Sequence, residues 1–509
     1  MGRVWVVVMM LCFGMLYGQI ANAEDVDERL RKLEEAVEQM KQRELRERPV
    51  PEYPAGAQPG ETLPDDSQTG YSSVFEGQRP MRKPGETPNL QQMSAEEQGA
   101  ERKYGVNLQG SGKLIYAKPF VSNPRAILGG YFDVEYINRA HEGTPSSIDV
   151  HRFVPFIYAD VSEHVKMAAE LEVEHGILES SGVPHSEVSL EFATMDFLVN
   201  EKLNFRAGVV LLPVGKFNLI HDAPLRDLTE RPLVTQLLSA TVLSETGAGM
   251  YGTFYPSARS KLDYELYVTT GFNGYGDCQA GSAQANSLSC VTRITEKSGV
   301  AGARQRSSNI SKGFDNNNGK AVVGRVAFSP FLGVEVGGSG YYGSYDPFGK
   351  RDLSMMVLDW TLVRGPFEVI GEAHWTYAQG NSQNLNGTPC TNPPTFGVAP
   401  GHFCPQRMEG YYIQGNYHFL PQWMTRLAPS FFRPEISTLT AMVRWEQVNT
   451  NKDQPDGLGD LQRLTLGVNY RPTEDTVFKF DFQYSPEAVN RYNQRIHDTA
   501  VLLSAATYF

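Results

Sequence analysis

From residue 125 to the end of the chain, apolar and polar side chains alternate in many short runs. In one run Phe478, Phe480 and Phe482 share one face, whereas Lys479 and Asp481 share the other. A period of two places successive side chains on opposite faces of a strand. The pattern therefore predicts an all-β region with sixteen strands, at about 126–138, 148–160, 164–174, 187–199, 203–212, 245–255, 260–271, 321–328, 333–345, 351–362, 366–378, 409–419, 435–448, 461–471, 476–484 and 497–509.

The connections between these strands alternate in length. The tight turns fall at 162–163, 200–202, 256–259, 329–332, 364–365 and 472–475. The longer loops fall at 139–147, 175–186, 213–244, 272–320, 379–408, 449–460 and 485–496. Short turns at one end, long loops at the other and an even strand number are typical of a membrane barrel. We therefore predict a 16-stranded antiparallel transmembrane β-barrel over residues 125–509. The connection 421–434 departs from this rhythm, because a short turn is expected there.

The last strand, read as DTAVLLSAATYF, ends on Phe509. In a closed barrel the last strand pairs with the first, so that no strand edge stays unpaired. A terminal Phe on such a strand resembles the end of bacterial outer-membrane barrel proteins, where the assembly machinery is thought to read it. We therefore expect Phe509 to be an assembly signal. The alternative is the final strand of a soluble β-protein.

The first residues indicate export. Residues 1–23 combine Arg3, an apolar run from Val4 to Ile20 and a small-residue site that ends on Ala23. These are the parts of a secretory signal peptide. We expect the mature chain to reach the bacterial outer membrane, with its N-terminal segment in the periplasm.

Three further segments precede the barrel. In residues 24–48 apolar side chains recur at heptad spacing, which predicts a short periplasmic coiled-coil helix, with a solvated single helix as the alternative. Residues 49–103 are rich in Pro, Gly, Gln and Glu, which predicts a disordered linker. Residues 104–124 are again β-like, and this pre-barrel segment would form either a strand or a segment in the barrel mouth.

Composition and charge agree with this interpretation. Aromatic residues make up 11% of the chain, and the net charge of −12 argues against nucleic-acid binding. Mean hydropathy is negative because only one face of each strand is apolar. Several tyrosines near predicted strand ends are candidates for interfacial aromatic girdles. These are Tyr131, Tyr158, Tyr255, Tyr341, Tyr377, Tyr470 and Tyr484.

No motif in the chain favours catalysis. Residues 247–252 match G-x-G-x-x-G by letter, but the following residues continue a strand, whereas a dinucleotide fingerprint needs a helix there. The ten histidines show no metal-ligand spacing. Residues 315–319 and 453–460 could bind Ca²⁺, although solvated turns are the simpler interpretation. We expect no enzyme activity, no cofactor and no metal; an outer-membrane hydrolase is the alternative.

Four cysteines remain after removal of the signal peptide, in two pairs. Cys278 and Cys290 fall in one predicted extracellular loop, and Cys390 and Cys404 fall in another. An even count grouped in this way in an oxidising compartment predicts two local disulfides, with a zinc site as the alternative.

The stretch from Pro213 to Leu233 and the Glu245-Thr246-Gly247 that opens the next strand resemble bacterial porins of the phosphate-selective porin O/P type. The similarity extends over about 125–509. It implies a homotrimer of 16-stranded barrels in which the third extracellular loop folds inward to narrow the pore. The corresponding loop here is about 213–244. Its charged residues are the candidate constriction set, namely Lys216, His221, Asp222, Arg226, Asp227, Glu230 and Arg231. The arginine ladders and clustered lysines that select phosphate in that family are not evident.

Alternation also assigns charged side chains to the barrel interior. The predicted acidic pore-lining residues are Asp133, Glu135, Glu170, Glu172, Glu174, Glu187, Glu191, Asp263, Glu265, Glu335, Asp359, Glu368, Glu372, Glu446 and Asp481. The predicted basic ones are Lys166, Arg206, Lys261, Arg325, Arg444, Arg463 and Lys479. The acidic excess predicts a channel that prefers cations or is nearly unselective.

These observations predict a porin. Sixteen strands leave an aqueous lumen, so the expected activity is passive diffusion and ion transport of small hydrophilic solutes, set by pore radius and fixed charge. The expected partners are outer-membrane lipid, the barrel assembly machinery and two further copies of the chain. The alternative is a plugged barrel without a free pore that serves as an anchor or adhesion platform.

Overall fold

The structure, a computed structural model, describes residues 125–141, 145–175, 187–240, 242–275, 292–304, 319–383, 390, 404–454, 459–489 and 494–509. The signal peptide, coiled-coil helix, linker and pre-barrel segment predicted for residues 1–124 lie outside the described residues, as does the predicted Cys278–Cys290 pair. No helix among the described residues is long and apolar enough to cross a membrane.

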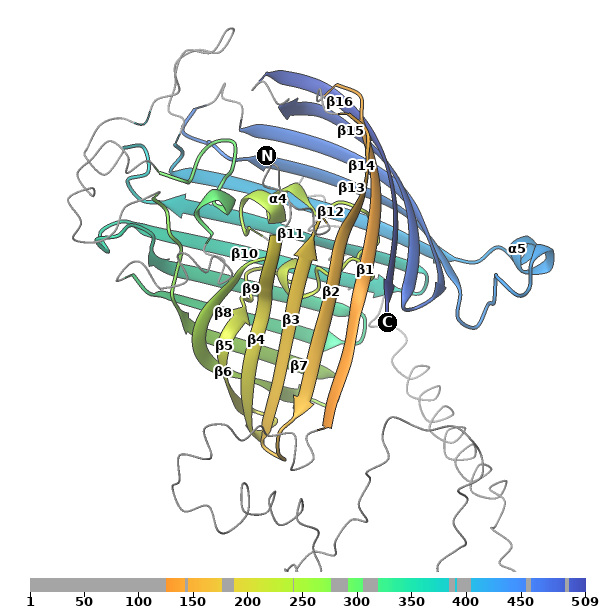
Figure 1. The fold of residues 1–509 in the computed structure, drawn as a ribbon, viewed down its shortest axis with the longest axis horizontal. Coiled ribbons are helices and arrows are strands. Elements are labelled where there is room, and N and C mark those ends of the chain that lie inside the picture. Colours follow the sequence, from red (N-terminus) through yellow and green to blue (C-terminus); the bar gives the residue numbers. More distant parts are fainter. Residues whose placement is uncertain are drawn as a thin grey trace, which may run out of the picture. The chain divides into compact units, whose positions relative to one another are not determined.

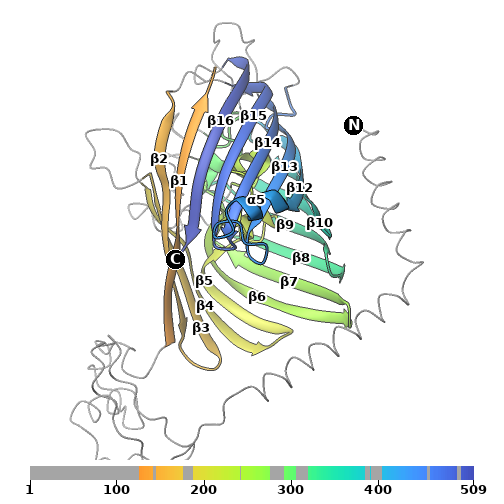
Figure 2. The same cartoon turned by 90° about the vertical axis from the view of Figure 1, so that its right-hand side faces the viewer.

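Sixteen strands form one closed antiparallel barrel, in which each strand pairs with its neighbours in the sequence (Figures 1 and 2). The predicted strand number and antiparallel order are thus confirmed. The strands are β1 (Arg125–Arg139), β2 (Ser147–Asp160), β3 (Val165–Glu174), β4 (Glu187–Asn200), β5 (Leu203–Leu211), β6 (Ser244–Ser257), β7 (Ser260–Thr269), β8 (Ala321–Phe331), β9 (Val334–Ser344), β10 (Asp352–Arg364), β11 (Phe367–Ala378), β12 (Arg407–Phe419), β13 (Thr438–Asn449), β14 (Asp460–Thr473), β15 (Thr476–Val489) and β16 (Arg495–Tyr508).

The first and last strands close the barrel. Strand β1 pairs with β16 from Tyr131–Tyr508 to Arg139–Ala500. Phe509 extends this ladder, because its N–H donates to Gly130 O at 2.9 Å and its carbonyl accepts from Gly130 N at 3.2 Å. Its ring stacks on Phe153 with centroids 5.8 Å apart. The terminal aromatic residue therefore belongs to the closing seam.

The outer face of the barrel is apolar. Large apolar side chains at alternate strand positions stay exposed, whereas their neighbours in the same strands are buried toward the interior. Phe478 and Phe480 are both 49% exposed, whereas Lys479 between them is 3% exposed. An exposed apolar surface that surrounds a closed barrel fits a hydrocarbon environment. Other exposed members include Met167, Met195, Phe197, Phe205, Met250, Leu266, Val268, Val322, Val326, Met356, Val443, Leu466, Phe482 and Leu503.

Three of the predicted girdle tyrosines face the interior instead. Tyr131 is fully buried in a cluster with Val154 and Val477, and Tyr341 is 2% exposed beside Phe272. Tyr158 lies on the inward face of β2 and lines an interior cavity. The prediction for these three residues was wrong, because an aromatic side chain near a strand end can also face the barrel interior. Tyr255, Tyr377 and Tyr484 remain exposed.

Short helical turns occur only in connections among the described residues. The loop after β5 contains η4 (Phe217–Leu219) and α4 (Leu233–Leu237), and the loop after β7 contains η6 (Ala301–Ala303). The unusually long connection between β12 and β13 contains α5 (Gln422–Leu427), which projects from the barrel at the end of these two strands (Figure 1).

Candidate functional site

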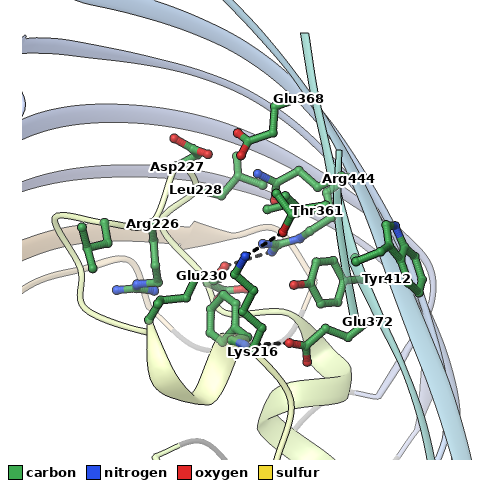
Figure 3. Close-up of a pocket in the computed structure, with 17 residues that line it drawn as sticks. Lys216, Arg226, Asp227, Leu228, Glu230, Thr361, Glu368, Glu372, Tyr412 and Arg444 are labelled. Atoms are coloured by element: carbon green, nitrogen blue, oxygen red, sulfur yellow. Dashed lines mark hydrogen bonds between the residues drawn. The ribbon is translucent and has the colours of Figure 1, made fainter. Parts of the chain in front are cut away.

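The loop from Leu212 to Leu243, between β5 and β6, lies against the interior face of the barrel wall (Figure 3). Asn218 ties the two ends of this loop together. Its side-chain NH2 donates to Leu212 O at 2.7 Å and to Leu243 O at 2.9 Å, and its carbonyl oxygen accepts from Leu243 N at 2.9 Å. This buried amide holds the neck closed while the intervening residues extend across the interior.

The first part of the loop is bound to β9, β10 and β11. Gly215 N donates to Ser339 Oγ at 2.9 Å, and Phe217 N donates to Glu372 Oε1 at 2.6 Å. Gly215 has a φ of +80° and lies so close to Glu372 that a Cβ would meet its carboxylate at 2.7 Å. Glycine is therefore required at this position by conformation and by space.

Lys216 reaches the same wall. Its ammonium group donates to Thr361 Oγ1 at 2.9 Å and lies 3.1 Å from the Glu335 carboxylate. The side chain is 27% exposed, so this pair remains in contact with solvent.

The far part of the loop is bound to β13, β14 and β15. Thr229 N donates to Asp481 Oδ2 at 2.6 Å, and Leu233 N donates to Glu446 Oε1 at 2.8 Å. Lys479 Nζ donates to Ala223 O at 2.7 Å. Charged strand residues thus satisfy backbone groups of the loop that would otherwise be buried without partners.

Leu228 packs directly onto the wall at Gly467. A Cβ on Gly467 would lie 2.3 Å from the Leu228 side chain, so the absence of a side chain on β14 makes room for the loop.

Glu230 is held by two guanidinium groups of the barrel wall. Its carboxylate pairs with Arg139 and Arg463, and it accepts a hydrogen bond from Gln483 Nε2 at 3.1 Å. Burial acts to raise the pKa of Glu230, but the two guanidinium groups outweigh it and lower the pKa to about 2. The carboxylate therefore stays charged and joins the loop to β1 and β14.

The next residue, Arg231, lies among other cations. Burial and the nearby Arg152 and Arg226 guanidinium groups lower its pKa to about 9. Arg226 lies 3.6 Å from Asp133 and 3.8 Å from Glu135. Carboxylates of β1 therefore face the guanidinium groups of the loop.

His221 contacts β4, and Asp222 contacts β16 at the closing seam. His221 is 2% exposed and pairs with Glu191, while its Nδ1 lies 2.8 Å from Asn218 O. Asp222 accepts a hydrogen bond from Tyr508 OH at 2.8 Å. Asp227 accepts from Asn416 Nδ2 at 2.8 Å. All seven charged residues predicted for the loop, from Lys216 to Arg231, therefore lie in contact with the barrel wall or with one another.

The group Asp133, Glu135 and His151 is compact enough to resemble a metal site. However, Arg226 occupies the space beside both carboxylates at 3.6 and 3.8 Å. A fixed guanidinium therefore already supplies positive charge to this group.

Two of the cavities formed by the described residues lie beside the loop. The first, which we call the loop cavity, measures about 250 Å³ and lies between the loop and β10–β13. Exposed Ile220 and Leu225 of the loop line it together with Phe217 and Tyr412. Its charged lining residues are Lys216, Arg226, Asp227, Glu230, Glu368, Glu372 and Arg444.

The second cavity, which we call the strand cavity, measures about 530 Å³ and is lined mainly by β2, β3, β4, β5 and β7. Arg206 donates to both Asp196 oxygens at 2.8 Å, and Lys166 lies 2.7 Å from Asp160. Glu265 also lines the cavity. Each cavity is therefore lined by one more acidic than basic residue.

The charged wall residues differ sharply in burial. One set, which we call the loop-covered wall, is buried in ion pairs or against the loop: Asp133, Glu135, Glu170, Glu172, Glu191, Glu372, Arg444, Glu446, Arg463, Lys479 and Asp481. Arg325 and Asp359 form a further buried pair at 2.6 Å. A second set remains half-buried or exposed: Lys166, Glu174, Arg206, Lys261, Asp263, Glu265, Glu335 and Glu368. The side chain of Glu187 lies outside the described residues.

Several charged interior residues were missed from the sequence. Arg152 is the clearest case, because its guanidinium pairs with Glu172 and Glu174 at 2.8 Å each. A register shift between β1 and β2 at Asp133–Val134 changes the parity of the facing strand. Arg139, Arg471 and Asp196 were also missed. Side-chain alternation identifies inward-facing residues of this kind only in strands without a bulge or register shift.

A second loop lies over the first. Val300 N donates to Leu237 O at 2.9 Å, and Arg304 Nη1 donates to Ala240 O at 3.0 Å. Ile294 and Val300 are fully buried in a cluster with Val234 and Leu238. Residues 292–304 therefore pack against α4 and the residues that follow it in the loop after β5.

One of the two predicted cysteine pairs lies among the described residues. The structure joins Cys390 to Cys404, with Cα atoms 5.8 Å apart.

Comparison with known proteins gives distant similarities. No family model matches the chain. An uncharacterized protein of Aquifex aeolicus (strain VF5) is 24% identical over 375 residues, which cover 70% of this chain and 74% of that protein.

Solved outer-membrane proteins align over most of the barrel. An anion-selective porin from Comamonas acidovorans is 11% identical and covers 76% of this chain and 100% of its own, with a TM-score of 0.43. The outer-membrane channel DcaP of Acinetobacter baumannii is 11% identical over 76% of this chain and 98% of its own, with a TM-score of 0.41. OmpF of Salmonella typhi, in a complex with daunomycin, is 9% identical over 75% and 97%, with a TM-score of 0.45. The strand pairing of this chain itself establishes the barrel.

Proposed function

We propose that this protein is a bacterial outer-membrane porin, a water-filled channel for passive diffusion of small hydrophilic solutes or ions. The observation that carries the proposal is the distribution of side chains across the barrel wall. Large apolar groups such as Phe478, Phe480 and Phe482 are exposed on the outer face, while the charged groups between them turn inward. This is the arrangement that a lipid exterior and an aqueous interior require.

The loop at about 213–244 narrows the channel in this proposal. It crosses the interior and is held there by strand residues from both sides, including Glu372 and Asp481. The path left open to solutes would run along the loop cavity and the strand cavity. Solutes would be sorted by size at the loop and by fixed charge on the walls, without chemistry. The porin O/P-like family remains our proposed relationship, without its phosphate preference.

The remaining parts of the chain fit an exported trimer. Residues 1–23 would be the signal peptide, 24–48 a periplasmic coiled-coil helix and 49–103 a disordered linker, with 104–124 before the barrel. The coiled-coil helix would add a contact between three copies that the barrels already gather. The barrel assembly machinery would read Phe509, which completes the closing seam.

A cation preference follows from the cavity charges. The strand cavity is lined by Asp160, Asp196 and Glu265 against Lys166 and Arg206. An excess of negative charge on the wall of a narrow channel raises the local concentration of cations.

A plugged barrel without a free pore is the second candidate, as an anchor or adhesion platform. It is favoured by the buried contacts between residues 292–304 and the loop after β5. Conductance of the purified protein in a planar bilayer separates the two functions. Stepwise currents support the channel, whereas a correctly folded barrel that inserts without conducting supports the plug.

A further inference from the structure

The connection between β12 and β13 carries an exposed apolar cluster. Its helix α5 has no buried residue, and Trp423, Leu427 and Phe431 are 64%, 75% and 71% exposed. Large apolar side chains gathered in this way on a rim need a covering environment. A connection of this length is not needed to join adjacent antiparallel strands.

Aromatic contacts hold this connection at the rim of the outer barrel face. Before it, Tyr417 stacks with Phe419 at 5.3 Å and contacts Phe367 at 4.9 Å. After α5, Phe432 lies 5.1 Å from the Tyr470 ring, and Tyr470 OH donates to Phe431 O. Tyr417 and Tyr470 occupy outward-facing strand positions. Rings at this level correspond to the aromatic belt at a membrane–water interface.

The same connection is cationic. Arg426 and Arg433 are both exposed, and Glu435 is the one acidic residue of the connection 420–437, which leaves a net positive charge. Among the described residues neither guanidinium forms an ion pair. Exposed arginines next to apolar side chains complement a surface that has phosphate groups above hydrocarbon, and a guanidinium binds phosphate with paired hydrogen bonds.

We propose that residues 421–434 are an interfacial anchor that binds the phospholipid leaflet at the short-turn end of the barrel. Trp423, Leu427 and Phe431 enter the boundary between headgroups and acyl chains, and Arg426 and Arg433 bind headgroup phosphates. This inference rests on the proposed outer-membrane location. It gives the long connection a role that is separate from the channel.

The test places a nitroxide label on the full mature protein in vesicles of phosphatidylethanolamine and phosphatidylglycerol. One background, in which serine replaces the four mature cysteines, carries L427C, F482C or D475C. Collisions with oxygen and with a water-soluble nickel complex report depth. Phe482 is the reference for the lipid-facing wall and Asp475 for a hydrated turn.

The label at position 427 is expected to be shielded from nickel and accessible to oxygen, close to the F482C value. A 427 label as accessible to nickel as the D475C label overturns the anchor. Dipolar broadening between 427 labels at a low protein-to-lipid ratio also overturns it, because it shows contact with a second copy. A hydrated F482C label refutes the membrane location itself and so distinguishes the two failures.

The arginines are tested by lipid preference. Spin-labelled phosphatidylglycerol should be immobilised by the protein more than spin-labelled phosphatidylcholine, and R426Q/R433Q should lose this excess. The matched variant R259Q removes a cation from another turn and should keep it. An unchanged excess in R426Q/R433Q contradicts phosphate binding by these residues.

Discussion

The loop-covered wall and the strand cavity contain the same kinds of charged side chain in opposite situations. Under the loop, Glu446 and Arg463 are buried and bind loop backbone or one another. In the strand cavity, Asp160 and Lys166 form a similar pair but are 53% and 38% exposed. Burial makes the first kind of pair costly to break, whereas solvent screens the second. Charges under the loop therefore hold it against the wall, whereas charges in the strand cavity would act on solutes in the proposed channel.

Removal of Phe509 should have the largest effect, because both walls depend on the closing seam. The deletion loses two backbone hydrogen bonds to Gly130 and the stacking on Phe153. We expect the yield of heat-modifiable barrel in the outer membrane to fall far more than one exposed side chain would explain. The substitution F509Y retains an aromatic ring and serves as the control. Normal assembly without Phe509 would refute its role as a signal.

Glu230→Ala should release the loop. It leaves Arg139 and Arg463 without their shared carboxylate, and breaking a buried ion pair costs roughly 3–5 kcal/mol. We expect larger and noisier single-channel currents. Asp160→Ala is the matched control, because loss of its exposed pair with Lys166 should cost at most about 1 kcal/mol. Equal current noise in the two variants would contradict the claim that the buried pairs under the loop position it and the exposed pairs of the strand cavity do not.

Low pH should weaken the same contact. The pKa of Glu230 is lowered to about 2, so its stabilising contribution is fully present above the ordinary value of 4.5. That contribution is lost as pH falls from about 4.5 toward 2. Channel noise should rise over this window in the wild type and should rise less in E230Q, which has no carboxylate to protonate.

Gly215→Ala should have a smaller effect. The left-handed conformation of this residue costs a side chain roughly 1–3 kcal/mol, and the Cβ would press on Glu372. The neck of the loop should shift while the barrel still forms. Thermal unfolding should change little, and mean conductance should change. The substitution G338A is the control, because no atom lies within 4 Å of its Cβ position.

The barrel was easier to predict from the sequence than its interior. Alternation at Phe478, Phe480 and Phe482 reports directly which face meets lipid, because each strand repeats the same physical requirement. Arg152 was missed because a register shift alters parity without a mark in the sequence. The position of the loop could be predicted, but its partners could not. The contact between Glu230 and Arg463 joins residues that no local pattern relates.

The long connection at 421–434 shows the same limit. Its length was evident from the sequence. The sequence alone did not show that the exposed Trp423 and Leu427 belong to a connection held at an aromatic rim of the barrel.

The most direct test of the account is the reversal potential of single channels under a KCl gradient, measured for the wild type and for D196N/E265Q. The account predicts stepwise conductance with a preference for K⁺ that declines as salt shortens the Debye length. It also predicts that the double variant, which removes two strand-cavity carboxylates, moves the reversal potential toward zero. A folded protein that never conducts, or one that prefers Cl⁻ at low salt, would contradict the account.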